Sequence, residues 1–292
     1  MSIEISAPKN LQDLADYIAS CNSQIEKHIG FCGENSAAVL NDIKNDFSDL
    51  SIENSFSVAY EDSVIVGVIG LDIDQEDSSA EVWGPFINNN DMELAEKLWN
   101  DMLITVPREI KNFKFFINNR NEFVESFLNN IGANFHGKHS LLDIDSKKFN
   151  NTDSRETINI SENYSHSFRD LHDTVFANAY YNGCQILSRL NQNNRLLILA
   201  KNDTDIEGYA YVEIPPELQE ADIEFIAVHP ETRSKGLGKR LLHEALQTIF
   251  ESPEINNVSL TVSHENIIAL NLYKSAGFQE IYILNYFSFE RA

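Results

Sequence analysis

Short apolar runs alternate with one strongly amphipathic segment in the second half of the chain. Four of these runs are rich in β-branched and aromatic residues and predict strands: 196–200, 208–214, 223–228 and 258–262. Between the last two, apolar residues recur at helical spacing: Leu237, Leu241, Leu242, Ala245, Leu246, Ile249 and Phe250. This spacing predicts an amphipathic helix. A short helix ending at Gly277 and a strand pair near 278–289 complete the pattern.

The first half repeats this order of elements. The runs 56–60 and 64–73 predict a hairpin, and a helix over 92–104 and a strand at 113–117 follow. The ends of the two halves correspond with an offset of 145 residues: Ile117 with Val262, Asn121 with Asn266, Leu128 with Tyr273, and Gly132 with Gly277. A repeat of half the chain length indicates a duplication rather than a solenoid.

The polar stretch 146–156 is the expected linker between the two copies. We therefore expect two domains, at residues 1–147 and 157–292. Both have the α/β (α+β) pattern of strands and helices in alternation.

Composition excludes several classes of function. The 292 residues carry 45 Asp and Glu against 22 Lys and Arg, a formal charge of −23. Because nucleic acids and anionic membrane surfaces are bound by basic faces, neither is an expected partner. No apolar run approaches the roughly 20 residues that span a bilayer, and the first residues lack the pattern of a secretory signal. We expect a cytoplasmic protein.

Cysteine and histidine show no pattern of a metal site. The three cysteines are too few and too scattered for a disulfide framework or a zinc cluster, and the eight histidines lack ligand spacing. We therefore expect no metal. Cys184 is a conceivable acyl-accepting nucleophile, but a buried free cysteine is the commoner interpretation because no histidine is near it in sequence.

A basic cluster stands out in the acidic chain. Four cations fall within eight positions: Arg233, Lys235, Lys239 and Arg240. One interpretation is a solvated helix face that answers nearby acids. The glycines Gly236 and Gly238 favour another, because they let backbone approach a ligand closely where a helix begins. The free N–H groups and the helix dipole would then bind a pyrophosphate.

The run at 223–246 (IEFIAVHPETRSKGLGKRLLHEAL), followed by NIIALNLYKSAGF at 266–278, resembles the GNAT superfamily of acyl-CoA-dependent N-acetyltransferases. The resemblance carries an R-x-x-G-x-G loop and an N-x-x-A-x-x-x-Y-x-x-x-G-F segment. It covers about residues 157–292. It implies two tandem GNAT-like domains, each a mixed, mostly antiparallel sheet flanked by helices, with the first copy degenerate.

The resemblance also implies the binding residues for acetyl-CoA, the expected co-substrate. Ala227 and Val228 would lie against the pantetheine, and Asn266 would reach it from the loop that opens the next helix. The residues around the pyrophosphate would be Arg233, Ser234, Lys235, Gly236, Leu237, Gly238 and Lys239.

Acetyl transfer to an amine needs a base and an acid. A base must take the proton of an amine whose reference pKa is about 10. Glu224 is the best candidate, since strand alternation would direct it away from the side of Ile223 and Phe225, and partial burial would raise its pKa. Asp222 and Glu213 are rival bases.

Tyr273 lies near the thioester sulfur by the resemblance and could protonate the departing thiolate. Alternatively, its ring fills the core.

The acceptor site is less defined. By the resemblance, Phe176, Tyr180 and Tyr181 belong to the part of the chain that lines the acceptor pocket, although core packing explains them equally well. The acceptor would be a primary amine of a small molecule or peptide. The alternative class is a non-catalytic acyl-CoA-binding or scaffold protein. The chain could be a monomer or a homodimer.

The first copy lacks the residues that would bind acyl-CoA. If Glu81 matches Glu224, residues 88–93 replace the phosphate loop, and they contain two acids and no glycine. Leu128 replaces the tyrosine. We therefore expect only the second domain to bind acetyl-CoA.

Overall fold

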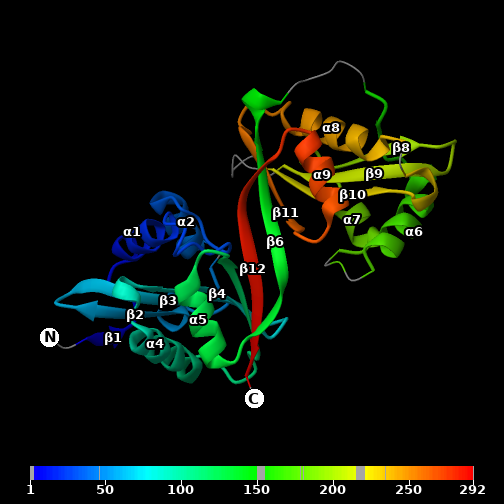
Figure 1. Ribbon diagram of the computed structural model, residues 1–292. Helices are drawn as coiled ribbons and strands as arrows, with labels where there is room; N and C mark the ends of the chain where they lie inside the picture. The colour runs from blue at the N-terminus through cyan, green and yellow to red at the C-terminus, as the bar shows by residue number, and fades with distance from the viewer. Residues whose placement is uncertain are drawn as a thin grey trace. The chain divides into compact units, whose positions relative to one another are not determined.

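The computed structural model describes residues 3–45, 47–149, 155–177, 179, 181–214, 221–233 and 235–291. Its strands follow the predicted order (Figure 1). In the first half they are β1 (Glu4–Ser6), β2 (Phe56–Glu61), β3 (Val64–Asp74), β4 (Ser79–Ile87), β5 (Asn112–Asn118) and β6 (Asn134–Asp145). In the second half they are β7 (Ile158–Asn159), β8 (Asn194–Ala200), β9 (Ile206–Glu213), β10 (Asp222–Val228), β11 (Asn257–Ser263) and β12 (Gln279–Glu290).

The helices repeat in the same way. Those of the first half are α1 (Leu11–Asn22), α2 (Ser36–Asn45), α3 (Ile52–Ser55), α4 (Met92–Thr105) and α5 (Glu122–Ile131). Those of the second half are α6 (Ser165–Val175), α7 (Gly183–Arg189), α8 (Leu237–Ile249) and α9 (Ile267–Ser275). Short 3-10 turns lie at Asn88–Asn90, Ser146–Lys148, Glu162–Tyr164 and Pro230–Thr232. The predicted amphipathic helix at 237–250 is therefore α8.

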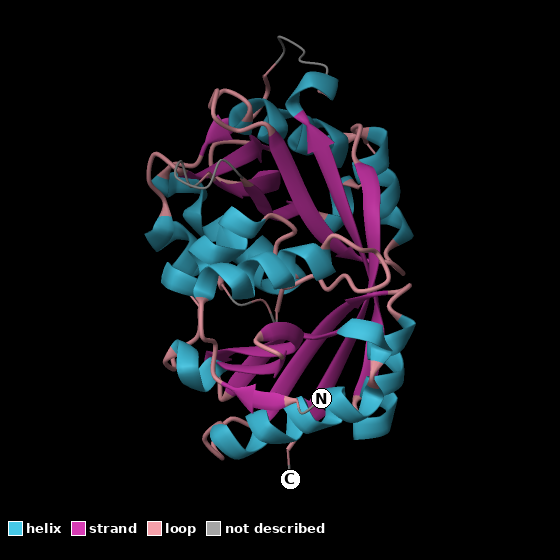
Figure 2. Cartoon of the chain, turned by 90° about the vertical axis from the view of Figure 1, so that its left-hand side faces the viewer, coloured by secondary structure: helices cyan, strands magenta, loops and turns pink. Residues whose placement is uncertain are grey.

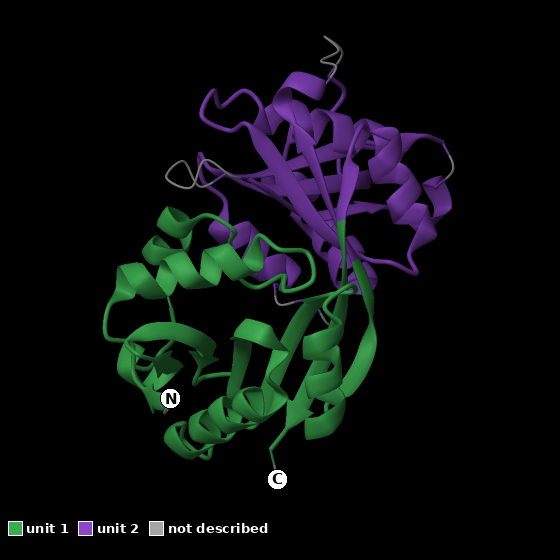
Figure 3. Cartoon of the chain, turned by 60° about the vertical axis from the view of Figure 1, so that its left-hand side comes forward, with its two compact units in different colours: residues 1–139, 282–292 green, residues 140–281 purple. Residues whose placement is uncertain are grey.

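Two compact units divide the chain (Figure 3). The first unit is Met1–His139 with Tyr282–Ala292, and the second is Ser140–Ile281. Both boundaries fall inside strands, because β6 and β12 each begin in one unit and end in the other. The sequence predicts domains at 1–147 and 157–292. That these two segments fold independently stays a prediction.

The two halves of the sequence exchange their last strands. In the sheet order β1-β2-β3-β4-β5-β12-β6-β11-β10-β9-β8-β7, β12 lies beside β5 and β6 lies beside β11. The antiparallel register of β12 with β5 runs from Leu284 opposite Asn118 to Glu290 opposite Asn112. β6 and β12 run side by side (Figure 1). The predicted strand pair near 278–289 is wrong: it is one strand, whose partners come from the other half.

Helices cover both faces of the strands in the second unit (Figure 2). On one face, α8 packs against β9 and β10 through Leu241, Leu242 and Leu246, which are fully buried, and α9 contacts α8. On the other face, α6 and α7 cover Tyr209, Tyr211 and Phe225. Strand side chains that alternate between two buried faces explain why these runs are apolar throughout. No helix in the described residues is long and apolar enough to cross a membrane.

The sequence repeat corresponds to a repeat of local structure. Asn121 and Asn266 are both helix N-caps: each side chain accepts a hydrogen bond from an amide three residues on, at 3.1 Å. Gly132 and Gly277 both adopt positive φ, at 78° and 107°, just after these helices. Asparagine and glycine are suited to these two positions because one caps free N–H groups and the other adopts the left-handed region without strain.

Candidate active site

β10 and β11 diverge where the candidate site begins. They pair in parallel at Asp222 opposite Ser259. Beyond that position no further pairing joins the two strands among the described residues, and Thr261 and Ser263 of β11 are exposed. The opening leaves strand edges available to hydrogen-bond an extended ligand.

Glu224 lies at a bulge in β10. The register with β9 shifts between Ile223 and Phe225, so Glu224 has no partner residue there. Ile223 joins the core cluster under α8, whereas Phe225 joins the cluster under α6. The expectation that Glu224 projects away from both neighbours on one side is therefore wrong, because the extra residue of a bulge interrupts strand alternation.

Glu224 is a half-buried carboxyl that has no partner in the described residues, unlike its rival Glu213. Burial raises the pKa of its carboxyl, and in the described residues it accepts no hydrogen bond and forms no ion pair. Glu213 is instead held by Arg189, with N–O distances of 3.0 to 3.2 Å, and by the Tyr211 hydroxyl. Asp222 is exposed. Glu224 is thus the one of the three that combines burial with free lone pairs.

The loop after β10 leads into an uncapped helix. Gly236 is the N-cap residue of α8, with φ 79° and no side chain to cap the helix. A residue with a Cβ would be strained at that φ. Arg240 N–H donates to Gly236 O at 3.1 Å. The amides of Leu237, Gly238 and Lys239 come before it and have no acceptor in the described residues, which leaves them free for an anion.

Three cations border these amides. Arg233, Lys235 and Lys239 are exposed and form no ion pair within the described chain. Arg233 only donates from Nε to Val228 O, at 3.4 Å. Arg240, in contrast, pairs with Glu156, so for this residue the solvated-face interpretation holds. Ser234, also predicted here, lies outside the described residues.

Ala227 and Val228 end β10 beside this loop. Ala227 is buried opposite Tyr209, and Val228 lies opposite Gly208. A Cβ on Gly208 would lie 2.6 Å from Ala227 O, so glycine lets the two strands meet there. A Cβ on Gly238 would lie 3.7 Å from Val228 Cγ2. The end of β10 and the start of α8 are therefore in close contact.

Asn266 and Tyr273 lie on α9. The Asn266 Oδ1 atom caps the helix at Ala269, while its Nδ2 group has no acceptor in the described residues. Tyr273 is 9% exposed and packs edge-on against Phe278. Burial raises the pKa of Tyr273 to about 12. Its ring therefore fills the core, and the role of its hydroxyl as an acid stays a prediction.

Phe176 and Tyr181 flank the segment between α6 and α7. The Phe176 ring lies 5.1 Å from that of Phe225 on β10. The Arg189 guanidinium covers the Tyr181 ring at 4.2 Å. Tyr180 lies outside the described residues.

His172 is the residue that sequence reasoning missed. It is fully buried on α6, with Nδ1 2.6 Å from Tyr209 Oη and Nε2 2.8 Å from Tyr181 O. Its position four residues after Phe168, on the apolar face of an amphipathic helix, was the available signal. A metal-ligand spacing search could not find it, because its partners are a tyrosine and a carbonyl.

The first unit places its own groups at the positions that correspond to the start of α8 and to the gap between β10 and β11. At the helix that corresponds to α8, the Asp91 carboxylate accepts from Leu94 N–H at 3.1 Å, so α4 begins with its own anion. Pro85, which has no N–H, follows Gly84 in β4 where Val228 stands in β10. Leu128 is fully buried in place of Tyr273.

A chain segment also fills the gap between β4 and β5. Those strands pair at Ser79–Glu81 with Asn112–Lys114. Beyond, Ile29 bridges Ile117: Gly30 N–H donates to Phe116 O at 2.6 Å, and Asn118 N–H donates to His28 O at 3.0 Å. The Asn121 side-chain amide also donates to His28 O, at 3.3 Å. We call residues His28–Gly30 the plug.

Aromatic and charged groups hold the plug in place. The His28 ring stacks on Tyr282 at 4.0 Å, and Tyr282 donates to Glu34 at 2.7 Å. Burial lowers the pKa of His28 to about 4, and nearby Glu34 partly opposes that shift. The plug lies in the 13-residue segment 23–35 between α1 and α2. The corresponding segment of the second unit, 176–182, has seven residues.

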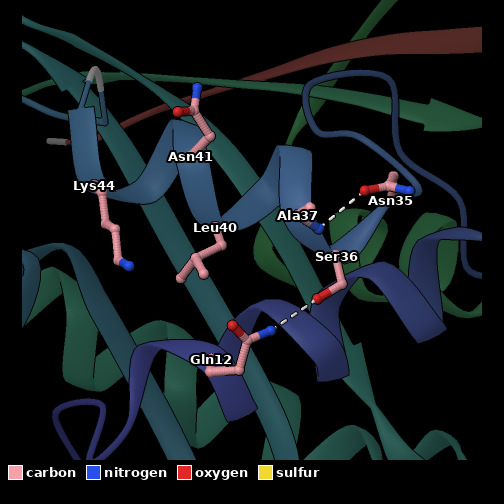
Figure 4. A pocket seen from close by; sticks show the side chains of 7 residues that line it. All are labelled: Gln12, Asn35, Ser36, Ala37, Leu40, Asn41 and Lys44. Carbon is pink, nitrogen blue, oxygen red and sulfur yellow. Dashed lines mark hydrogen bonds between the residues drawn. The ribbon is translucent and has the colours of Figure 1, made fainter.

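Another hollow of the first unit contains none of the predicted residues. A groove of about 560 Å³ lies between α1 and α2, lined by Gln12, Asn35, Ser36, Ala37, Leu40, Asn41 and Lys44 (Figure 4). Several of its polar groups form hydrogen bonds with one another: Gln12 donates to Ser36, and Asn35 accepts from the Ala37 amide at the start of α2. In the described parts of the chain, no group of three or more His, Cys, Asp or Glu side chains could hold a metal.

Comparisons with known proteins agree with this geometry. The model of the acetyltransferase (GNAT) family matches residues 149–278. No curated protein matches the chain. Among solved structures, a GCN5-related N-acetyltransferase from Sphaerobacter thermophilus is similar with a TM-score of 0.70 and 13% identity, covering 99% of this chain and 95% of that one.

Two further structures show the same arrangement. A tandem GNAT protein from the clavulanic acid biosynthesis pathway has a TM-score of 0.62 and 13% identity, over 99% of this chain and 98% of that one. A GNAT-family acetyltransferase from Colwellia psychrerythraea has a TM-score of 0.56 and 13% identity, over 98% and 100%. The predicted fold, two tandem GNAT-like copies, is confirmed.

Proposed function

We propose that the second unit transfers an acetyl group from acetyl-CoA to a primary amine. The match of residues 149–278 to the acetyltransferase (GNAT) family model and the tandem GNAT fold of the chain support this proposal. One observation carries the proposal. The second unit combines an α8 start without a capping side chain, strands β10 and β11 that part after Asp222, and the half-buried Glu224 on the same strand β10.

The residues at the start of α8 fit the phosphates of acetyl-CoA. Free amides, three exposed cations and the helix dipole favour a pyrophosphate, and Gly236 and Gly238 allow it to approach the backbone. Ala227, Val228 and the Asn266 amide would hold the pantetheine. When bound, acetyl-CoA supplies an activated thioester as acyl donor.

Glu224 and Tyr273 would carry the protons. Glu224 accepts a proton from the ammonium form of the acceptor, directly or through a water, so that the amine nitrogen can attack the carbonyl carbon. Its raised pKa makes it a stronger base than an exposed glutamate. Tyr273 donates its phenolic proton to the departing thiolate. Because both Glu224 and the amine lose protons as the pH rises, kcat/KM should rise with pH between 6 and 9.

The acceptor would be a small molecule or peptide amine. The chain's charge of −23 favours a cationic acceptor, because an acidic surface attracts amines in their protonated form. A polyamine, an aminoglycoside-like antibiotic, an amino-acid derivative and a peptide N-terminus all carry such a group.

One acetyl-CoA should bind to each chain. The first unit caps α4 with the Asp91 carboxylate, which would repel a phosphate, and its plug pairs with the edge of β5, so this cleft offers a ligand fewer free groups than the cleft of the second unit. Isothermal titration calorimetry should therefore give one site per chain. A second site would contradict this part of the proposal.

A panel of these four amine classes, assayed with acetyl-CoA by release of the free thiol, tests the activity. We expect turnover with at least one class. Arg233→Ala should weaken acetyl-CoA binding, while Glu224→Gln should retain binding and lose turnover. Acetyl-CoA binding without turnover on any amine would favour the non-catalytic acyl-CoA-binding alternative.

A further inference from the structure

His172 connects two walls of the second unit. Its helix, α6, covers the face of β9 and β10 that carries Tyr209 and Phe225. One ring nitrogen meets the Tyr209 hydroxyl, and the other meets the Tyr181 carbonyl. Tyr209 lies directly opposite Ala227 in the strand register. A single side chain therefore bonds both to the strand pair that would carry the cofactor and to the segment 176–182.

The partners determine the tautomer of His172. A carbonyl oxygen can only accept, so the hydrogen lies on Nε2 and is donated to Tyr181 O over 2.8 Å. The other nitrogen, Nδ1, then accepts from the Tyr209 hydroxyl over 2.6 Å. Both polar atoms of the imidazole are satisfied, which a fully buried side chain requires.

Aromatic rings fix the orientation of the imidazole. Phe225 of β10 contacts it edge-on, with ring centroids 4.8 Å apart and planes at 90°. Phe176, at the end of α6, lies 5.4 Å from it and also contacts Phe225. The ring therefore has no room to turn and exchange its two hydrogen bonds.

Other backbone hydrogen bonds of the described residues near this segment are local. Phe176 N–H donates to His172 O at 2.8 Å, and Gly183 N–H donates to the Asp173 carboxylate at 2.7 Å. The Tyr181 ring is covered by Arg189, which is itself held by Glu213. The His172 bond to Tyr181 O joins the main chain of this segment to a side chain in the interior of the unit.

We propose that His172 is a positioning residue that fixes the Tyr181 backbone relative to β9 and β10 and thereby determines the affinity for the acceptor amine. This rests on the proposed function, in which Phe176 and Tyr181 line the acceptor site. His172 acts through Tyr181 and does not touch the acetyl-CoA or the reacting atoms. It governs the KM for the amine rather than kcat or the affinity for acetyl-CoA.

Two amide substitutions separate the two hydrogen bonds. In His172→Gln the side-chain amide can reach the position of Nε2, so the bond to Tyr181 O is retained. In His172→Asn the shorter side chain reaches only the position of Nδ1, so Tyr209 keeps a partner and Tyr181 O loses its donor. The two variants place the same amide group in the same buried site, and each serves as the control for the other.

Steady-state kinetics with the best amine of the panel give the first test. We expect the amine KM to rise about three- to tenfold in His172→Asn, in line with the loss of one hydrogen bond, and to stay near wild type in His172→Gln. The kcat and the acetyl-CoA dissociation constant should be unchanged in both. Equal KM values in the two variants, or a parallel loss of acetyl-CoA affinity, would overturn the proposal.

Hydrogen exchange gives a test that does not depend on activity. The amides of Asn182 and Gly183 should exchange faster in His172→Asn than in wild type or in His172→Gln, because the preceding carbonyl has lost its anchor. Faster exchange in a protein that acetylates no amine would leave the positioning role intact and refute the proposed function. Unchanged exchange in a protein that does acetylate an amine would refute the positioning role.

Discussion

The two units have the same local structure but differ in what fills the cleft. Asn121 and Asn266 cap corresponding helices in the same way, yet the spare Asn121 amide donates to His28 O of the plug. The Asn266 amide has no such partner in the described residues. The first unit thus satisfies with its own backbone the groups that the second unit leaves for a ligand.

The helix after the cleft shows the same difference. In the first unit α4 begins at Asp91, which neutralises the helix dipole and caps a free amide. In the second unit α8 begins at Gly236, which does neither. A glycine N-cap stabilises a helix less than a capping side chain does, by roughly a few tenths of a kcal/mol, a small cost that a bound phosphate would offset.

The largest expected effect is on kcat, and it distinguishes Glu224 from Glu81, two half-buried carboxyls. Glu81 and Glu224 occupy corresponding strands, and burial raises the pKa of each, with Asp72 adding repulsion at Glu81. Glu224→Gln should lower kcat about 10²- to 10⁴-fold, because it removes the base. Glu81→Gln should leave kcat unchanged. Steady-state kinetics of both variants with one amine would show this, and equal losses would mean that Glu224 is not the base.

The free energy of unfolding at pH 7 should rise in both glutamine variants. A carboxyl whose pKa is raised by folding binds protons more tightly in the native state, so the free energy of unfolding falls as pH rises through that range. Neither glutamine variant carries this penalty. Each should therefore unfold at a higher urea concentration than wild type at pH 7, with the advantage disappearing near pH 4. A loss of stability in Glu224→Gln would point to structural damage instead.

Tyr273→Phe should reduce kcat about 100-fold, the lower end for loss of an acid, because water can also protonate the thiolate. Leu128 fills the corresponding position in the first unit without a hydroxyl. Packing there needs no polar group, so the melting temperature of Tyr273→Phe should stay unchanged. An unchanged kcat would leave Tyr273 with the core-packing role alone.

Moving an acid into the second unit should make it resemble the first. In Gly238→Asp, a carboxylate at the start of α8 suits the helix dipole but repels the pyrophosphate. The Cβ has room there, because its nearest neighbour would be Leu272 at 3.6 Å. We expect the acetyl-CoA dissociation constant to rise at least about tenfold, as loss of a charge-assisted hydrogen bond predicts.

Gly238→Ala is the matched control for the charge. It adds the same Cβ without the carboxylate, so its effect on affinity should be clearly smaller. If alanine weakens binding as much as aspartate does, then close backbone approach rather than charge limits the site. Calorimetric titration of the two variants would distinguish these results.

The smallest effect concerns the paired caps. Asn121→Ala and Asn266→Ala should each lower the free energy of unfolding by about 1 kcal/mol, as loss of an N-cap does. Acetyl-CoA affinity should fall only in Asn266→Ala, since the Asn121 amide already donates to His28 O whereas the Asn266 amide has no acceptor in the described residues. Urea unfolding and calorimetry on both variants would measure the two effects. A loss of affinity in Asn121→Ala would contradict the plugged first unit.

The sequence predicts much of the second unit because its signals are local. The loop at 233–238 contains glycines where a helix begins, and a positive φ at Gly236 confirms the conformational reason for one of them. The sequence predicts a short helix ending at Gly277, and α9 ends just before this residue, which has a positive φ. Glu224 was identified by its place in a strand, although the bulge that contains it was not foreseen.

The features that the sequence missed depend on distant contacts. The plug and His172 both interact with residues more than eight positions away, through backbone atoms that every residue possesses. The greater length of segment 23–35 was visible, but nothing in its residues specified β5 as its partner. The exchange of β6 and β12 is of the same kind, because an apolar pattern predicts a strand and not the strand beside it.

The sequence by itself determined the duplication, the helix and strand types, and the glycine loop with its cations. These follow from hydrophobic period, capping residues and backbone freedom, which act over a few residues. Only the tertiary structure decided which carboxyl is buried, which helix start is left uncapped by its surroundings, and which cleft is filled. Those outcomes depend on solvent exclusion and hydrogen-bond partners brought together from distant parts of the chain, so they exist only once it has folded.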